Sequence, residues 1–408
     1  MIPAAPVSMQ HATVPPRWQQ LWREAVRDPR ELLSLLGLAH LAGELSEDAA
    51  TQFPLRVPRG FVDRMRHGDP HDPLLRQVLP LDDEDRIVAG FGLDAVGDIA
   101  ARAASGVIRK YHGRALLVAT GSCAIHCRYC FRRHFPYAEE TAAAGGWSDA
   151  IALIASDASI DEVILSGGDP LSLATSKLAE LTDALASIPH LKRLRIHTRL
   201  PTVLPERVDA ALLAWLRALP WPVTVVVHVN HANEFDGKVD AALASLRETG
   251  AASKGIVLLN QAVLLRGVND SVATMGMLVR RLSYVNVHPY YIYLCDMVKG
   301  VEDLRTSVAV AEQIEKGVRG MTAGFNTPTF VCDTPGGGGK RCVHSYETYN
   351  RETGVAVYTA PSVKAGRYFV YCDPLHSLSE DCRARWRDPE QRRVMVEEAL
   401  AEAKRRDS

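Results

Sequence analysis

Hydrophobic positions in the middle of the chain fall into short runs that alternate with longer amphipathic segments. Six runs rich in β-branched and aliphatic residues span 115–119, 162–166, 193–198, 223–229, 256–263 and 285–293. Helical periodicity lies between them, for example over 178–186, 208–219 and 239–249. Strands that alternate with helices form repeated βαβ units and a parallel sheet. The pattern therefore predicts an α/β fold whose sheet is either open or curved into a barrel.

The two ends of the chain follow other patterns. Residues 17–50 show helical periodicity, and a Pro-rich, charged connection follows over 56–84. After residue 300 a helix is predicted near 307–319, then strand-like runs at 355–358 and 368–371, and a charged helix from about 388. We therefore predict four regions: an N-terminal helical region (1–100), a barrel (101–300), a C-terminal α+β segment (301–375) and a helical tail (376–408).

Candidate site residues follow several of the predicted strands. Parallel α/β folds place their active sites at the carboxyl ends of the strands. Because the candidates come from different strand ends, we expect the six strands to curve into a partial (β/α)6 barrel.

Composition and charge narrow the class of protein. Hydrophobic residues make up 47% of the 408 residues, and 47 Lys and Arg against 48 Asp and Glu leave a net charge of −1. These values are those of a globular protein with no global attraction to nucleic acid or anionic membranes. The longest apolar runs reach about ten residues where a bilayer needs roughly 20, and the first eighteen residues lack the pattern of a secretory signal. We expect a cytoplasmic protein without nucleic-acid or membrane partners.

Three of the eight cysteines, Cys123, Cys127 and Cys130, lie within eight positions directly after the first predicted barrel strand. Three thiolates on one loop can ligate three irons of a [4Fe-4S] cluster and leave the fourth iron open to a ligand. Structural zinc would need a fourth ligand, for which the sequence has no second close pair. A redox use of Cys127 and Cys130 alone would leave Cys123 unexplained. The alternatives to a catalytic cluster are a non-catalytic iron–sulfur protein and a zinc-binding structural module.

The motif Cys123-Ala-Ile-His-Cys127-Arg-Tyr-Cys130, followed by Phe-Arg-Arg-His-Phe, resembles the cluster motif of radical S-adenosylmethionine (SAM) enzymes. The continuation is similar to that of the lysine 2,3-aminomutase family, in which the open iron chelates SAM. Two further matches to SAM-contacting positions depend on this resemblance, because alone they indicate a turn and a structural histidine. They are the loop Ser166-Gly167-Gly168-Asp169 and the strand-end residue His228.

Four glycines precede Lys340. A phosphate-binding loop of the Walker type is excluded, because Thr334 and Arg341 stand where it needs Gly and Ser or Thr. The glycines could give Lys340 freedom to reach into the barrel and form an imine with pyridoxal phosphate (PLP), and a flexible surface loop is the alternative. The resemblance implies that PLP is held on Lys340. It also implies that the PLP phosphate is bound by Lys110, Tyr111 and Arg114.

The resemblance implies a reaction and a substrate class. An electron from a donor such as flavodoxin or ferredoxin cleaves SAM, and the 5′-deoxyadenosyl radical starts migration of the α-amino group to Cβ. Arg132 matches the position that pairs with the substrate carboxylate, and Asp296 and Asp333 match the acids that receive the distal ammonium of lysine. We therefore expect L-lysine to be converted to β-lysine. Two carboxylates also suit a guanidinium, so an L-arginine 2,3-aminomutase of antibiotic biosynthesis is the alternative.

Features of two branches of the family are combined in the chain. Residues 53–64 and 131–137 resemble the branch that makes β-lysine for elongation factor P, whereas the segment 333–340 and the long C-terminus resemble the free amino acid branch. The latter often binds zinc between subunits through a C-terminal cysteine set, of which only Cys372 and Cys382 are present. A homo-oligomer is implied by the resemblance, and the structural zinc remains open.

Overall fold

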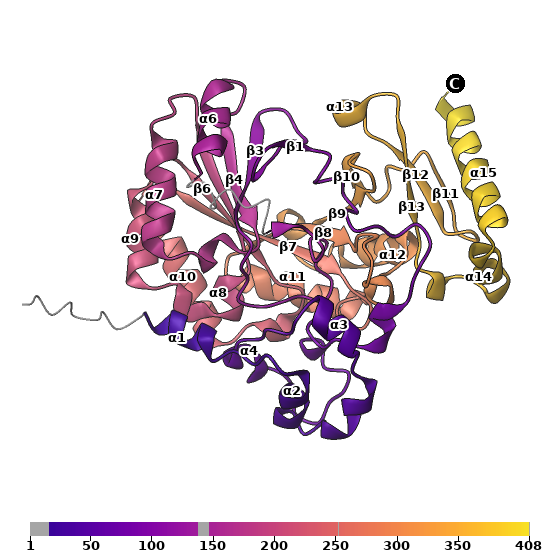
Figure 1. The fold of residues 1–408 in the computed structure, drawn as a ribbon, viewed down its shortest axis with the longest axis horizontal. Coiled ribbons are helices and arrows are strands. Elements are labelled where there is room, and N and C mark those ends of the chain that lie inside the picture. Colours follow the sequence, from indigo (N-terminus) through magenta and orange to yellow (C-terminus); the bar gives the residue numbers. More distant parts are fainter. Residues whose placement is uncertain (1–15, 138–146, 252, 408) are drawn as a thin grey trace, which may run out of the picture.

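A ten-stranded sheet dominates the computed structural model, which describes residues 16–137, 147–251 and 253–407 (Figure 1). The strands from β3 to β9 run parallel, each beside the next along the chain, with β1 and β10 as edges of the described sheet. The sheet is thus open, and the predicted α/β partial barrel is confirmed. Its strands are β1 (Arg102–Ala104), β2 (Val107–Ile108), β3 (Arg114–Thr120), β4 (Glu162–Gly167), β5 (Arg193–Thr198), β6 (Val223–His228), β7 (Ile256–Leu264), β8 (His288–Leu294), β9 (Thr329–Thr334) and β10 (Gly339–Cys342).

All six predicted strands form, as β3 to β8, with ends within three residues of the expected positions. The sheet also continues past residue 300, because β9 pairs in parallel with β8 and β10 pairs antiparallel with β9. Hydrophobic alternation missed these two strands because Asp333, four glycines and Lys340 interrupt their apolar pattern. The hairpin of β9 and β10 therefore belongs to the barrel sheet.

Helices cover the outer face of the barrel and leave its inner face to partly exposed polar side chains. In β5 the buried residues Leu194, Ile196 and Thr198 alternate with the partly exposed Arg195 and His197, as expected for a strand with two different faces. Figure 1 shows most of the covering helices stacked along one side of the sheet. The helices between or after the strands are α6 (Ser148–Ser156), α7 (Thr175–Ala186), α8 (Leu200–Val203), α9 (Ala210–Ala218), α10 (Gly237–Ala251), α11 (Val272–Tyr284) and α12 (Val308–Val318).

The N-terminal region consists of short helices that pack against the loop after β3. His126 N donates to the carbonyl of Arg56 (3.0 Å), and Arg128 donates to the carbonyls of Phe53 and Gln77. These bonds explain how a largely irregular segment is held in place. Its elements are α1 (Arg17–Arg23), α2 (Pro29–Leu35), η1 (Ala39–Glu44), α3 (Glu47–Gln52), α4 (Arg59–Val62), η2 (Leu75–Gln77) and η3 (Asp82–Asp85), where η marks a 3₁₀ turn.

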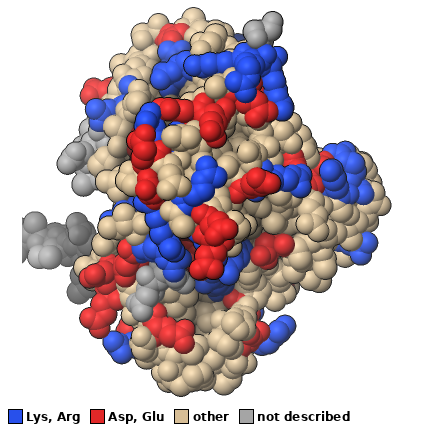
Figure 2. Space-filling model, turned by 90° about the vertical axis from the view of Figure 1, so that its right-hand side faces the viewer, with Lys and Arg blue, Asp and Glu red and all other residues tan. Residues whose placement is uncertain are grey.

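The C-terminal part forms a second, three-stranded antiparallel sheet covered by the last helix. On the face that carries this helix, acidic and basic side chains are intermixed (Figure 2), and Arg393 pairs with both Glu390 and Glu397. The elements are β11 (Thr348–Asn350), β12 (Val355–Thr359), α13 (Pro361–Lys364), β13 (Tyr368–Cys372), α14 (Glu380–Arg387) and α15 (Pro389–Asp407). In the described ranges, no helix is both long and apolar enough to cross a membrane.

Candidate active site

The three clustered cysteines lie on the loop after β3, each with a free, partly buried thiol. Burial and the neighbouring Cys127 raise the pKa of Cys130 to about 11, and burial likewise raises that of Cys123. Within the described ranges, no three or more His, Cys, Asp or Glu side chains converge on one metal position. The cysteines of a cubane cluster each bind a different iron, so they need not converge on one point. The donor set fits a cluster, whose binding would deprotonate the thiols.

The predicted SAM-binding loop packs directly against the cysteine loop. Gly168 N donates to the Thr120 carbonyl (2.7 Å) and Asp169 N to the Ser122 carbonyl (2.8 Å). A Cβ atom on Gly168 would lie 2.5 Å from the Ser122 oxygen, so only glycine permits this approach. Gly167 pairs with Thr120 in the sheet. The two glycines therefore allow the end of β4 to pack closely against the start of the cysteine loop.

The Asp169 carboxylate is fully occupied by protein donors. It accepts hydrogen bonds from Leu171 N (3.0 Å), Thr198 Oγ1 (2.7 Å), Arg199 N (2.7 Å) and Leu200 N (3.1 Å). These bonds fix the turn η5 (Pro170–Ser172) and the start of α8. In this arrangement Asp169 supports the loop through its carboxylate, and its predicted contact with SAM stays a prediction.

His228, at the end of β6, lies against the cysteine loop. Its Nε2 is 2.8 Å from the hydroxyl of Tyr129, a residue between Cys127 and Cys130, and the two rings stack at 5.5 Å. Burial and the charge of Arg199 lower the pKa of His228 to about 3. A neutral imidazole is thus brought to the edge of the predicted cluster site.

Lys340 occupies a strand, where a flexible glycine-rich segment was expected. In the hairpin of β9 and β10 it is paired with Asp333, whose Oδ2 lies 3.1 Å from Lys340 Nζ. Lys340 N donates to the Tyr111 hydroxyl (3.0 Å). Gly339 has φ of +80°, and a Cβ there would lie 2.7 Å from the same hydroxyl. The glycines therefore provide a tight turn and a close approach to Tyr111.

Two carboxylates predicted to receive a cationic side chain come close enough to repel each other. Burial and the charge of Asp333 raise the pKa of Asp296, which follows β8, to about 8. Asp333 Oδ1 is buried and has no hydrogen-bond partner in the part of the chain that the structure describes. A buried carboxylate oxygen without a partner is costly. The pair therefore fits a bound cation.

Arg132, predicted to bind the substrate carboxylate, is held by a residue that sequence reasoning missed. Asp98 accepts from Arg132 Nε (2.7 Å) and pairs with Lys110 Nζ (2.5 Å), while Arg132 Nη1 donates to Ser166 Oγ (3.2 Å). Burial would raise the pKa of Asp98, but the two cations outweigh it and lower the pKa to about 2. Asp98 thus orients both side chains, and no motif marked it.

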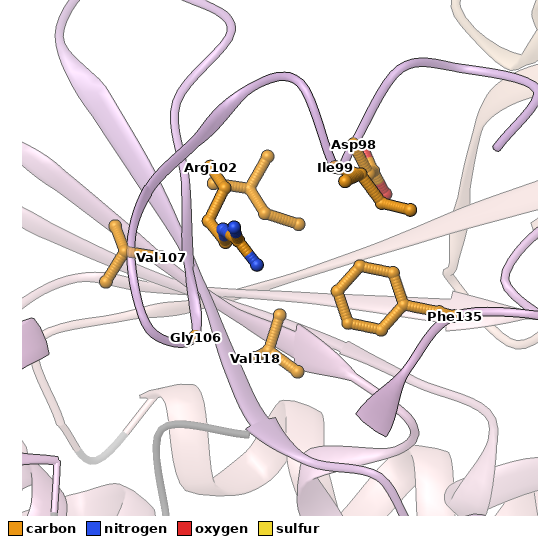
Figure 3. A pocket seen from close by; sticks show the side chains of 8 residues that line it. Asp98, Ile99, Arg102, Gly106, Val107, Val118 and Phe135 are labelled. Atoms are coloured by element: carbon orange, nitrogen blue, oxygen red, sulfur yellow. The ribbon is translucent and has the colours of Figure 1, made fainter. Parts of the chain in front are cut away.

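A small cavity lies beside Asp98, between the β1–β2 hairpin and the loop that follows the cysteines (Figure 3). It is lined by Asp98, Ile99, Arg102, Gly106, Val107, Ile108, Val118 and Phe135.

His197, on the inner face of β5, was also missed. Its Nε2 is buried and finds no hydrogen-bond partner among the described residues. Burial lowers its pKa well below the ordinary value, and the charges of Arg195, Lys340 and Arg132 act in the same direction. His197 therefore lies within electrostatic range of Lys340 and of Arg132. The alternation of apolar and polar residues along β5 could have indicated that His197 faces the inside of the barrel.

The residues beside Lys340 fit PLP. The Arg114 guanidinium stacks over the Tyr111 ring at 4.2 Å and forms no ion pair with any described residue. An available guanidinium and a phenol suit a phosphate dianion. Lys110 Nζ lies 2.5 Å from Asp98, a carboxylate that it shares with Arg132, and its predicted contact with the PLP phosphate stays a prediction.

Comparisons with known proteins give the family. The chain is 42% identical over 320 residues to the L-lysine 2,3-aminomutase of Escherichia coli, covering 78% of this chain and 92% of the relative. It is 39% identical over 324 residues to the enzyme of the same name from Acetoanaerobium sticklandii, covering 79% and 77%. The chain belongs to the lysine 2,3-aminomutase family.

The chain was also compared with protein-family models and with solved structures. The search against protein-family models returned no match. Among solved structures, a radical SAM methyltransferase from Sphaerobacter thermophilus aligns with a TM-score of 0.37 and 17% identity, over 55% of this chain and 68% of that chain.

Proposed function

We propose that this chain is an isomerase that moves the α-amino group of L-lysine to Cβ and so makes β-lysine. The relatives named L-lysine 2,3-aminomutase support the reaction. The observation that carries the proposal is the lysine hairpin, which brings Lys340 against Asp333 and Tyr111. Two residues of the segment 333–340 thereby meet Tyr111, which lies 229 positions before Lys340 in the chain.

The cysteines 123, 127 and 130 would hold a [4Fe-4S] cluster with SAM, and Lys340 would hold PLP, with Arg114 and Tyr111 at its phosphate. Bound there, these groups supply a reducing electron, the 5′-deoxyadenosyl radical and a π-system across which nitrogen migrates. Ser166 and His228 lie at the cysteine side of the barrel, where SAM would bind.

Charge on the protein's own residues selects the substrate. Asp333, with its unpartnered Oδ1, and Asp296 would accept the distal ammonium of lysine, which relieves their mutual repulsion. Arg132, oriented by Asp98, retains further N–H donors for the substrate carboxylate. The two ends of the substrate are thus held by opposite charges, which fixes the position of Cα and Cβ between them.

The reaction needs an electron donor, and we propose a small redox protein such as flavodoxin or ferredoxin. A cytoplasmic homo-oligomer is part of the same proposal. Cys372 and Cys382 are free, and the described residues form no zinc-like ligand group around them.

The test is an anaerobic assay of protein reconstituted with iron and sulfide, using dithionite, SAM and PLP. Lysine, arginine and glutamate are offered separately, and mass spectrometry after chiral derivatisation identifies the product. β-Lysine is the expected result. β-Arginine would contradict the substrate assignment while keeping the reaction, and SAM cleavage without any β-amino acid would contradict the aminomutase itself.

A further inference from the structure

Arg199, directly after β5, donates a hydrogen bond to one of the three clustered cysteines. Its Nη1 lies 2.7 Å from Cys127 Sγ. Its Nη2 donates to Gln77 Oε1 (2.7 Å) and to Glu234 Oε2 (3.0 Å). The side chain is only 7% exposed, and that of Glu234 is fully buried. A fixed positive charge therefore lies against a sulfur that the proposed function assigns to iron.

The partners of Arg199 are themselves held in place. Glu234 Oε1 accepts from the backbone N–H groups of Asn230 (2.8 Å) and His231 (3.2 Å), and Gln77 Oε1 accepts from Asn230 Nδ2 (3.0 Å). The guanidinium carbon also lies 5.5 Å from the ring centroid of Phe61 and 5.8 Å from that of Tyr129. A network with this many bonds leaves the guanidinium one orientation.

We propose that Arg199 is a positioning residue that holds the Cys127 sulfur and raises the reduction potential of the cluster, with Glu234 as its opposing charge. Reduction adds one electron to the cluster, and a fixed cation stabilises the added negative charge. Hydrogen bonds to cluster sulfurs and local charge are the protein's means of setting this potential. The inference rests on the proposed cluster but not on the identity of the amino acid substrate.

The experiment is a redox titration, monitored by electron paramagnetic resonance, of the anaerobically reconstituted full chain without SAM or lysine. In Arg199→Gln the cluster should become harder to reduce. We expect about a tenfold fall in the one-electron reduction equilibrium, which corresponds to roughly 59 mV. In Glu234→Gln the opposing charge is removed, so the potential should rise above that of the wild type.

The double variant R199Q/E234Q separates the effect on potential from the effect on folding. Arg199→Gln alone leaves Glu234 as an unpaired buried charge and should lower the melting temperature. Removing both charges should restore much of that loss, while the potential stays below the wild-type value because the bond to sulfur is still missing.

Arg305→Gln is the matched control. Arg305 is also a fully buried arginine paired with a buried carboxylate, Glu302, but it bonds to the carbonyl of Cys372 in the C-terminal sheet. This variant should lose stability without a shift in cluster potential. An unchanged potential in iron-replete Arg199→Gln would overturn the proposal. If that variant loses its iron, an unchanged or lowered potential in Glu234→Gln would overturn it.

The proposed function and this inference fail separately. Shifts in the expected directions in a protein that makes no β-lysine would uphold the role of Arg199 and refute the substrate. β-Lysine production with no shift in potential would uphold the proposed function and refute the role of Arg199. A wild-type protein that assembles no cluster would overturn both.

Discussion

Buried carboxylates differ between the side of the barrel that carries the cysteine loop (the cysteine side) and the side that carries the hairpin of β9 and β10 (the lysine side). On the cysteine side, Asp169 accepts four hydrogen bonds and Glu234 is bonded to Arg199 and to backbone N–H groups. On the lysine side, Asp333 has an unpartnered buried oxygen and the pKa of Asp296 is raised to about 8. The first two carboxylates are bonded to the protein throughout, whereas Asp333 uses only Oδ2, in its pair with Lys340, and leaves Oδ1 for a ligand.

This difference distinguishes carboxylates that stabilise the fold from carboxylates that bind a ligand. A satisfied buried carboxylate stabilises the fold, whereas an unsatisfied one costs stability until a partner arrives. The cysteine side is therefore a preformed frame, and the lysine side becomes complete only with a cationic ligand. Substitutions on the two sides should have different consequences.

The largest expected effect is on the lysine side. Lys340→Ala removes the amine that would hold PLP, so formation of β-lysine should fall by about 10³-fold or more. Iron content and the visible absorbance of the cluster should stay at the wild-type level, because Lys340 contacts the hairpin and Tyr111 and no cysteine of the loop. Product formation is measured by mass spectrometry and iron by colorimetric assay.

Lys364→Ala is the control for that variant. Lys364 lies beside the same hairpin and donates to the carbonyl of Gly336 (2.9 Å), but it is not part of the site. Activity within about twofold of the wild type is expected. Equal turnover in Lys340→Ala and wild type would refute the PLP assignment.

The complementary substitution removes a cysteine of the loop after β3. Cys130→Ser should remove one cluster ligand, so iron content and SAM cleavage should be lost while PLP still loads onto Lys340. Cys342→Ser, at an exposed cysteine two residues after Lys340, should retain both. Loss of PLP absorbance in Cys130→Ser would show that the two sides are not independent.

A matched pair of isosteric substitutions compares the two kinds of carboxylate. Asp169→Asn replaces an acceptor of four hydrogen bonds by an amide that must turn an NH₂ group toward some of these donors. It should lower the free energy of unfolding by about 2–3 kcal/mol. Asp333→Asn loses the ion pair with the partly exposed Lys340 but also removes the repulsion of Asp296. It should therefore change the free energy of unfolding by less than about 1 kcal/mol, yet raise KM for lysine about tenfold or more. Chemical denaturation and steady-state kinetics measure the two effects, and the comparison fails if Asp333→Asn is the more destabilising change.

The smallest effect concerns pH. With its pKa at about 8, Asp296 is mostly protonated at pH 7 in the free enzyme, and the ammonium of lysine favours the carboxylate. KM for lysine should therefore fall by about an order of magnitude between pH 7 and 8.5. Because the folded-state pKa is raised, Asp296 should also cost stability as pH rises from about 4 to 8.

Kinetics of Asp296→Asn over the same pH range check this assignment. The variant should lose the pH dependence of KM. If KM of the variant still depended on pH, the titrating group would not be Asp296. Asp333 also raises the pKa of Asp296, whereas Lys340, Lys110 and Arg305 lower it.

Much of the molecule could be predicted from the sequence. Local hydrophobic patterns decide where strands β3 to β8 begin and end, and the motifs placed Lys340 and Asp333 in one segment. The sequence could not show that the glycines make a hairpin, because this depends on the approach of Tyr111, 229 positions away along the chain. Nor could it show Asp98, Arg199 or His197 as site residues, since their roles come from contacts between distant segments.

The most direct test of the account is to find where PLP binds. The protein is loaded with PLP, reduced with borohydride, digested and mapped by mass spectrometry. We expect the pyridoxyl mass on the peptide that contains Lys340, and its loss in Lys340→Ala. Labelling at another lysine, or none at all in protein with an intact cluster, would contradict the claim that the lysine side of the barrel is built to receive this ligand.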